Sequence, residues 1–394
     1  KYELLKIDDD RPNETKLDFY NKYYRDIVKI ISLLKSSAVI TDNIHELIPL
    51  AKELADYHSI DWPEEEDFTK AIQQIWLKFP QKEKVIDFDD MIYLPVVKGY
   101  VKPIYEYVFV DEAQDLNQLQ RLFISKLLSP TGRVIVVGDS NQAIYGFRGA
   151  DTKSLDNFQE QFNAEVLPLT VSFRCSPAVV AEAKKLVPDF QHRFKGRISD
   201  VDLEELGVVD HITEHNFHSN VDDGDFVLCR VTKDLVEACL KLIAGGKKAK
   251  VRGKEMGTSI LAHIDKIPAP ILTDEVVEAY FNKLIAKNEA KDKRFLVKKL
   301  QEELDILLVI IGSLNIGTRE YVKKRTKDIF SDKVEGITLS TIHKIKGLEA
   351  DKVFLIRPDL IPHPKAELDW ELRQEQNMQY VAITRAKKEF YYVG

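Results

Sequence analysis

Two acidic residues that directly follow an apolar run are the first candidates for chemistry in this 394-residue chain. Residues 105–110 are Tyr-Glu-Tyr-Val-Phe-Val, and Asp111 and Glu112 come next. Open parallel sheets place their functional groups just beyond the carboxyl ends of strands, so this position favours action on a ligand. Asp111 would hold Mg²⁺, which prefers oxygen ligands, and Glu112 would orient or deprotonate an attacking water. The competing interpretation is a pair of solvated acids at the start of a helix.

A second polar segment follows the apolar run at residues 134–137 and has the sequence GDSNQAIYGFRGA (residues 138–150). Gln142 could contact a phosphate or the attacking water. Phe147 and Arg148 offer a stacking surface and a phosphate contact, a combination suited to single-stranded nucleic acid. Tyr145 joins these nucleic-acid-binding candidates, although the residue by itself predicts a core position. The competing interpretation is a glycine-rich loop with buried aromatic side chains.

The elements that must position these residues are of two kinds. From residue 105 onward, short apolar runs alternate with helical patterns, which predicts parallel sheets covered on both faces and therefore an α/β fold. Residues 1 to about 84 and 258–332 instead have helical patterns, among them the apolar spacing of Leu17, Tyr20, Tyr24, Ile27 and Ile31. The predicted helices include residues 44–57, 68–79 and 295–314. The predicted strands are residues 105–110, 134–137, 166–169, 226–229, 337–339, 353–356 and 390–393.

Charge and composition exclude several classes of protein. Lys and Arg number 57 against 64 Asp and Glu, so the net charge of −7 excludes a uniformly basic surface but not a locally basic groove. Residues 241–254 hold six basic side chains and no acidic one, for which a solvated loop is the favoured interpretation. The longest aliphatic run, at 306–311, is far shorter than the roughly 20 residues that cross a bilayer. Three scattered cysteines favour a reducing compartment, hence the cytoplasm.

Four segments, in chain order, resemble successive motifs of superfamily 1 DNA helicases of the UvrD/Rep/PcrA type. They are residues 111–115, 138–150, 341–349 (TIHKIKGLE) and 375–386 (EQNMQYVAITRA). One such match could be coincidence, but four in the family's order at strand ends are specific. The resemblance covers roughly residues 85–255 and 335–394. It implies two RecA-like parallel-sheet motor domains with helical accessory subdomains, and ATP with Mg²⁺ bound between the two motor domains.

The resemblance also implies roles for individual residues in the first motor domain and in the segment after it. Asp111 and Glu112 match the magnesium-binding and water-activating acids, and Gln142 matches the residue that couples the γ-phosphate to the nucleic-acid groove. Arg174 matches an arginine that contacts the γ-phosphate. Phe173 matches the aromatic residue that packs on adenine, where many relatives have tyrosine. Stacking survives that change, but a hydroxyl contact does not.

Further roles fall near the carboxyl terminus of the chain. Arg385 matches the second arginine, a finger that neutralises charge developing on the transferred phosphoryl group, a task for which a planar guanidinium is suited. Glu349 matches an acid that contacts ribose. Thr341 and His343 match residues that face nucleic acid, although a lone histidine beside a strand is often only structural.

The phosphate loop of such motors, G-x-x-x-x-G-K-[ST], does not occur in the sequence. We therefore expect either that the first motor domain is truncated at its N-terminus or that the parent protein has lost the loop. In both cases this chain alone should hydrolyse ATP poorly or not at all, and its first sheet should expose an edge or face. The expected organisation is a helical accessory subdomain at 1–84, the remainder of the first motor domain at 85–165, the second motor domain at 166–257 and 333–394, and a helical insertion at 258–332.

The function implied by the resemblance is an ATP-dependent DNA helicase or translocase. Such a motor acts on single-stranded DNA or single/double-strand junctions, usually in the 3′ to 5′ direction. We expect a monomer or weak dimer with no membrane association, and the sequence does not identify any partner protein. The alternative is a catalytically silent nucleic-acid-binding or scaffolding subunit that keeps the helicase fold. Another phosphoryl-transfer enzyme fits less well, because Phe147 and Arg148 suit a nucleic-acid strand.

Overall fold

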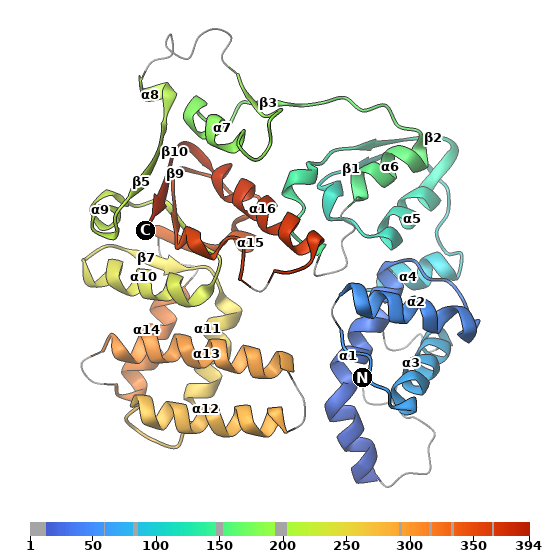
Figure 1. Cartoon of the computed structure of the whole chain (residues 1–394), viewed down its shortest axis with the longest axis horizontal. Helices are drawn as coiled ribbons and strands as arrows, with labels where there is room; N and C mark the ends of the chain where they lie inside the picture. Colours follow the sequence, from blue (N-terminus) through green and yellow to red (C-terminus); the bar gives the residue numbers. More distant parts are fainter. Residues whose placement is uncertain are drawn as a thin grey trace. The chain divides into compact units, whose positions relative to one another are not determined.

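A computed structural model describes residues 13–58, 60–81, 86–146, 153–193, 203–290, 294–314, 317–331, 335–364 and 366–394. The chain divides into two compact units (Figure 1). Unit 1 comprises Lys1–Leu167 with Ala290–Lys293, and unit 2 comprises Pro168–Glu289 with Arg294–Gly394.

The first part of unit 1 is helical. It contains α1 (Asn13–Ser36), α2 (Ile44–Tyr57), α3 (Glu66–Lys78) and α4 (Asp90–Val97). Asn43 caps α2 by accepting a hydrogen bond from the backbone N–H of His45, which fixes the predicted start of this helix. Ile27 and Ile31 are buried in the shared core, as their spacing predicts, whereas the side chains of Leu17 and Tyr20 lie outside the described residues.

The second part of unit 1 is a parallel pair of strands, β1 (Tyr105–Val110) and β2 (Leu128–Val136). Two helices, α5 (Gln118–Leu127) and α6 (Ser154–Phe162), supply apolar side chains that pack on the pair. A capping box fixes the start of α5, with the side chain of Asn117 bonded to the backbone N–H of Gln120 and the reverse. The expected uncovered face is present, since Tyr105, Tyr107 and Phe109 alternate along β1 and are all exposed.

Unit 2 is built on a six-stranded sheet in which every pairing is parallel, with the strand order β5-β10-β9-β6-β8-β7. The central strands are almost wholly buried and apolar, as expected of a sheet covered on both faces, and the predicted α/β class is confirmed. The strands are β5 (Val208–Ile212), β6 (Phe226–Cys229), β7 (Ala249–Val251), β8 (Ile337–Thr341), β9 (Ala350–Ile356) and β10 (Ala386–Val393).

The helices of the insertion, together with α9 and α10, share one continuous core with this sheet. Val251 and Leu339 of the sheet belong to the same buried cluster as Ile260 and Phe330 of the helical insertion. The predicted helix at 295–314 is confirmed with small shifts in its ends, and it lies alongside α12 (Figure 1). The helices are α7 (Pro177–Ala183), α8 (Leu203–Leu206), α9 (Glu214–Asn220), α10 (Thr232–Ala244), α11 (Lys254–Ile264), α12 (Asp274–Glu289), α13 (Arg294–Gly312), α14 (Arg319–Ile329), α15 (Ile342–Ile345) and α16 (Asp369–Ile383).

Two predictions from the sequence are wrong. Residues 166–169 are not a strand; they form an irregular segment in which Leu169 is 91% exposed, and only the short β3 (Val171–Ser172) pairs, with β4 (Gln191–His192). Residues 241–254 are not a solvated loop throughout, because they include β7. Alternation explains the error: Ala249 and Val251 enter the core on either side of Lys250, so a basic segment still fills a sheet position.

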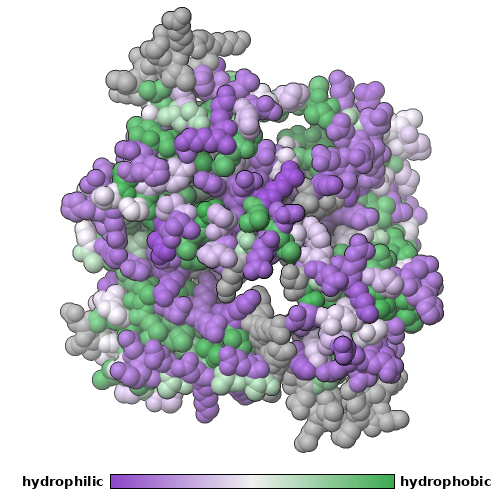
Figure 2. All heavy atoms as spheres, viewed as in Figure 1, coloured by the Kyte–Doolittle hydropathy of each residue, from purple (hydrophilic) through white to green (hydrophobic). Residues whose placement is uncertain are grey.

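The face drawn in Figure 2 is mostly hydrophilic, with apolar residues in small groups. Among the helices that the structure describes, none combines the length and the apolar character needed to span a bilayer.

Candidate functional site

In unit 1, backbone hydrogen bonds bring the two predicted strand-end segments together. The N–H of Val137 donates to the carbonyl of Val110 at 2.8 Å, and the N–H of Ala113 donates to the carbonyl of Val137 at 3.1 Å. The ladder between β1 and β2 therefore extends into both segments. Between them Glu112 has a left-handed backbone, with φ 50° and ψ 38°. Non-glycine residues seldom adopt this conformation, and it is concentrated at functional sites.

A buried amide connects the proposed catalytic residues of unit 1. Gln114 donates through Nε2 to Oε2 of Glu112 at 2.6 Å, and its Oε1 accepts from the N–H of Asp139 at 3.0 Å. Asp139 in turn accepts from Nε2 of Gln142 at 2.9 Å. Glu112 and Gln142 are thus the ends of one hydrogen-bonded chain, which the sequence reasoning did not anticipate. The one sequence feature that pointed to this chain was the glycine at position 138. A Cβ at this position would lie only 2.6 Å from Oε1 of Gln114.

Asp111 fits the requirements of a magnesium ligand. Its side chain is exposed, and one carboxylate oxygen accepts the N–H of Glu112 at 2.8 Å. In the part of the chain that the structure describes, the other oxygen meets no hydrogen-bond donor. The described residues contain no group of three or more His, Cys, Asp or Glu that could hold a metal by themselves. A single carboxylate suits Mg²⁺, which commonly takes one or two protein oxygens and completes its shell with phosphate and water.

In unit 2, Arg174 and Glu349 form an ion pair between side chains far apart in the sequence. Lys387, which the sequence reasoning missed, pairs with the other oxygen of Glu349 at 3.0 Å. The hydrogen bond from Lys387, followed by the charge of Arg174, holds the pKa of Glu349 below its usual value. The segment around Arg174 is fixed in place because the N–H of Ser176 donates to the carbonyl of Lys387 at 2.7 Å. Two cations against one carboxylate leave this cluster positively charged.

Arg385 is buried next to this cluster, with 2% of its surface exposed. Its Nε donates to the carbonyl of Val381 at 3.0 Å, Nη2 to Oγ1 of Thr384 at 3.2 Å, and Nη1 to the carbonyl of Leu348 at 3.4 Å. Because Leu348 precedes Glu349, Arg385 and Arg174 bind neighbouring residues. The structure therefore brings Arg174, Glu349 and Arg385 together within unit 2.

The remaining candidates are distributed more widely. Phe173, beside Arg174, is 76% exposed and presents its ring to solvent. Thr341 ends β8 and His343 lies in α15, at the carboxyl edge of the sheet, whereas Glu349 and Arg385 immediately precede β9 and β10 at the amino edge. Tyr145 in unit 1 is half-buried. Phe147 and Arg148 lie outside the described residues.

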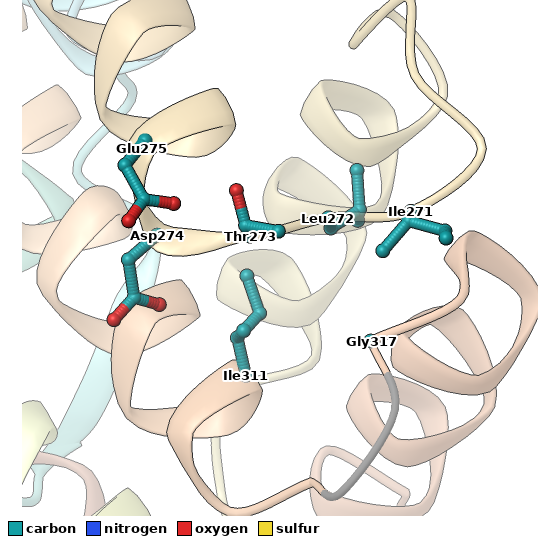
Figure 3. Close-up of a pocket in the computed structure, with 7 residues that line it drawn as sticks. All are labelled: Ile271, Leu272, Thr273, Asp274, Glu275, Ile311 and Gly317. Carbon is teal, nitrogen blue, oxygen red and sulfur yellow. The ribbon is translucent and has the colours of Figure 1, made fainter.

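A pocket of about 490 Å³ lies in the helical insertion of unit 2, and none of its lining residues belongs to either cluster (Figure 3). Asp274 and Glu275 at the start of α12 project on one side of it, and Ile311 of α13 on another. Its lining includes two carboxylates and no cation, which is unfavourable for a phosphate. The lining residues are Ile271, Leu272, Thr273, Asp274, Glu275, Ile311 and Gly317.

Comparison with known families places the chain among UvrD-like helicases. The family model of the UvrD/REP helicase N-terminal domain matches residues 4–163, and that of the UvrD-like helicase C-terminal domain matches residues 274–393. Together the two models cover most of the chain. The chain belongs to the UvrD/PcrA type of superfamily 1 helicases, as the resemblance of its motifs predicts.

The curated relatives are similar at low identity. The ATP-dependent DNA helicase PcrA of Staphylococcus aureus (strain Mu50 / ATCC 700699) is 23% identical over 465 aligned positions, which cover 86% of this chain and 62% of the relative. DNA helicase II of Haemophilus influenzae is 28% identical over 143 positions, covering 32% of this chain and 20% of the relative. The first alignment is longer than the 394-residue chain, so that relative carries segments without a counterpart here.

Proposed function

We propose that the protein is the motor portion of an ATP-dependent DNA helicase or translocase that acts on single-stranded DNA or single/double-strand junctions in the 3′ to 5′ direction. The observation that carries the proposal is the hydrogen-bonded chain from Glu112 through Gln114 and Asp139 to Gln142 at the ends of β1 and β2. We assign residues 85–165 to the first motor domain, 166–257 and 333–394 to the second, and 1–84 and 258–332 to helical accessory parts.

In this proposal the residues of unit 1 prepare the attack on ATP. Asp111 would hold Mg²⁺, which when bound neutralises charge on the phosphates. Glu112 would accept a proton from the attacking water, and its orientation is set by the amide of Gln114 at 2.6 Å. Gln142 would respond to the γ-phosphate. Because Gln142 and Glu112 are joined through Asp139 and Gln114, a shift at one is transmitted to the other.

The residues of unit 2 would recognise the nucleotide from their own cluster. Arg174 and Arg385 would stabilise negative charge on the transferred phosphoryl group, as permanently charged planar donors. Phe173 would stack on the adenine and Glu349 would contact the ribose. Thr341 and His343, at the opposite edge of the sheet, would face the nucleic acid, as would Tyr145, Phe147 and Arg148 in unit 1.

A second candidate function is a catalytically silent nucleic-acid-binding or scaffolding subunit. The absence of a G-x-x-x-x-G-K-[ST] sequence from all 394 residues favours it. For the same reason we infer that this chain by itself hydrolyses ATP poorly or not at all.

Phosphate release measured with oligodeoxythymidylate separates the two functions, if both this chain and the longest protein encoded by its gene are tested. DNA-stimulated turnover in the long form that is lost in Glu112→Gln supports the motor. Binding of DNA without turnover in either form supports the silent subunit. Robust turnover by the 394-residue chain alone would contradict the inference that it is inactive.

We further propose a cytoplasmic location and a monomer or weak dimer. Cys175, Cys229 and Cys239 are all buried free thiols. Burial raises the pKa of Cys229 to about 11 and that of Cys239 to about 12, which keeps both thiols protonated and unreactive. Three unpaired thiols suit a reducing compartment.

A further inference from the structure

We infer that three cations at the carboxyl edge of the unit 2 sheet bind the phosphate backbone of a nucleic-acid strand. They are Arg252, Lys254 and Lys344, referred to below as the Arg252 surface. The inference rests on the proposed function, which supplies nucleic acid as the ligand, and it assigns that ligand to three side chains to which the motif resemblance gives no role, although Lys344 lies within the motif at 341–349.

The three cations come from the ends of two neighbouring strands. β7 pairs with β8 up to Val251, and the N–H of Arg252 then donates to the carbonyl of Leu339 at 2.8 Å. Lys254 begins α11, and Lys344 lies in α15, which follows β8. The ammonium of Lys344 lies 3.4 Å from the position that a Cβ on Gly253 would occupy. Since Gly253 stands between Arg252 and Lys254, the three exposed side chains arise from one small area.

Other arginines in equivalent positions at this edge are neutralised within the protein. Arg230 directly follows β6 and forms three contacts of 3.0–3.2 Å with the buried carboxylate of Glu375. Arg357 directly follows β9 and pairs with Asp359 at 2.8 Å and with Asp234 at 3.4 Å.

The Arg252 surface lacks such internal partners. Among the residues that the structure describes, no carboxylate pairs with Arg252, Lys254 or Lys344, although Glu255 is adjacent in the chain. Neighbouring like charges repel one another, and an anionic ligand removes that repulsion.

The position of the surface favours a nucleic-acid strand over a free nucleotide. β8 lies between β6 and β7, and Thr341 at its end pairs with Cys229 of β6. The Arg252 surface therefore lies beside Thr341 and His343, the predicted nucleic-acid contacts, and extends them along the same edge of the sheet to the neighbouring strand β7. The cluster of Arg174 and Arg385, proposed to bind the nucleotide, lies at the opposite edge of the same sheet. Consecutive phosphates of a strand match several separate cations, and release of their counterions makes the binding depend on salt.

The test is the salt dependence of DNA binding by the purified 394-residue chain. Fluorescence anisotropy with labelled oligodeoxythymidylate of about 20 nucleotides would give the affinity between about 50 and 200 mM salt. The variant is Arg252→Ala/Lys254→Ala/Lys344→Ala. The matched control is Lys283→Ala/Lys287→Ala/Lys298→Ala, which removes the same charge from exposed lysines of α12 and α13 that have no partners among the described residues. Circular dichroism would verify that both variants are folded.

We expect the surface variant to bind more weakly and its slope of log K against log salt to decrease in magnitude by about 2, since each single-strand phosphate contact contributes about 0.7. The control should retain the slope of the unaltered chain. If the unaltered chain binds and both variants match it in slope, the Arg252 surface is not a phosphate site, while the proposed function stands. If the unaltered chain binds no DNA, both proposals are overturned.

Discussion

The connection between Gly138 and Gln114 gives the sharpest prediction for the proposed catalytic face of unit 1. A Cβ at residue 138 would stand 2.6 Å from Oε1 of Gln114, 3.2 Å from the N–H nitrogen of Ala113 and 3.2 Å from Cδ2 of Leu155. Gly138→Ala therefore has to displace the amide of Gln114. That displacement breaks its bonds to the N–H of Asp139 and to Glu112.

The expected loss follows from these two bonds. A neutral hydrogen bond contributes about 1 kcal/mol and one to a charged group about 1.5–3 kcal/mol, with the low end appropriate because Glu112 is exposed. Replacing glycine by alanine also lowers the conformational entropy of the unfolded chain, which stabilises the folded state by about 0.4–1 kcal/mol. Gly138→Ala should thus lower the free energy of unfolding by about 2 kcal/mol. Gln114→Ala should lower it by about 2–3 kcal/mol, because it removes the same bonds and leaves the N–H of Asp139 unpaired.

The double variant tests the cause, since Gln114→Ala removes the group with which the new methyl clashes. In the Gln114→Ala background, Gly138→Ala should therefore cause almost no further loss of the free energy of unfolding. The double-mutant cycle should then give a coupling of about 2 kcal/mol between the two positions. Urea unfolding followed by fluorescence monitors unit 1 when Trp370 is replaced by phenylalanine in all variants, which leaves Trp62 and Trp76 as the only tryptophans. Because α5 contributes Leu119 to the helical core and Ile124 to the core under the sheet, the two parts should unfold together. Additive losses, or a neutral Gly138→Ala, would refute the reasoning.

Three further predictions concern the two clusters and the unit 2 sheet. Glu112→Gln in the longest form of the protein should leave ATP binding in place and reduce turnover steeply; equal phosphate-release rates would remove Glu112 from the mechanism. Arg385→Lys should lower the free energy of unfolding of unit 2 by about 2–4 kcal/mol, because lysine cannot reach Val381, Leu348 and Thr384 together; an unchanged Trp370 fluorescence transition would contradict this. Burial raises the pKa of Asp225 from 3.8 to about 6, so its folded state binds protons more tightly than the unfolded chain. The free energy of unfolding should consequently fall, relative to Asp225→Asn, as the pH rises from about 4 to about 6, and parallel pH profiles would exclude the effect.

Several elements could be predicted from the sequence because their local pattern agrees with their environment. β1 is aromatic or β-branched at every position except Glu106, β6 is apolar throughout, and α2 begins at a capping asparagine. Residues 166–169 have a similar apolar pattern but form no strand among the described residues, because strand formation also requires a neighbour to pair with. β5 was missed because Asp210 and His211 interrupt its apolar run, which an edge strand tolerates.

In the candidate site too, features set by adjacent residues could be predicted from the sequence, whereas contacts between distant segments could not. The strand-end position of Asp111 and Glu112 follows from the sequence, since it depends on adjacent residues. The link through Gln114 depends on the left-handed backbone of Glu112 and on the register of β1 with β2. The contacts of Lys387 and Arg385 depend on tertiary packing, which places the segments around Glu349 and Ser176 beside the start of β10. No spacing rule specifies these tertiary relations, although Gly138 marks one of them.

The central claim is that Asp111, Glu112, Gln142, Arg174 and Arg385 serve one nucleotide. The most direct measurement is a structure of the longest form of the protein with Mg²⁺, an ADP–fluoride mimic of the transferred phosphoryl group and oligodeoxythymidylate. We predict Asp111 at the metal, Glu112 and Gln142 at the water facing the fluoride, and both arginines on the fluoride atoms. A bound nucleotide with Arg174 or Arg385 directed elsewhere would contradict the account.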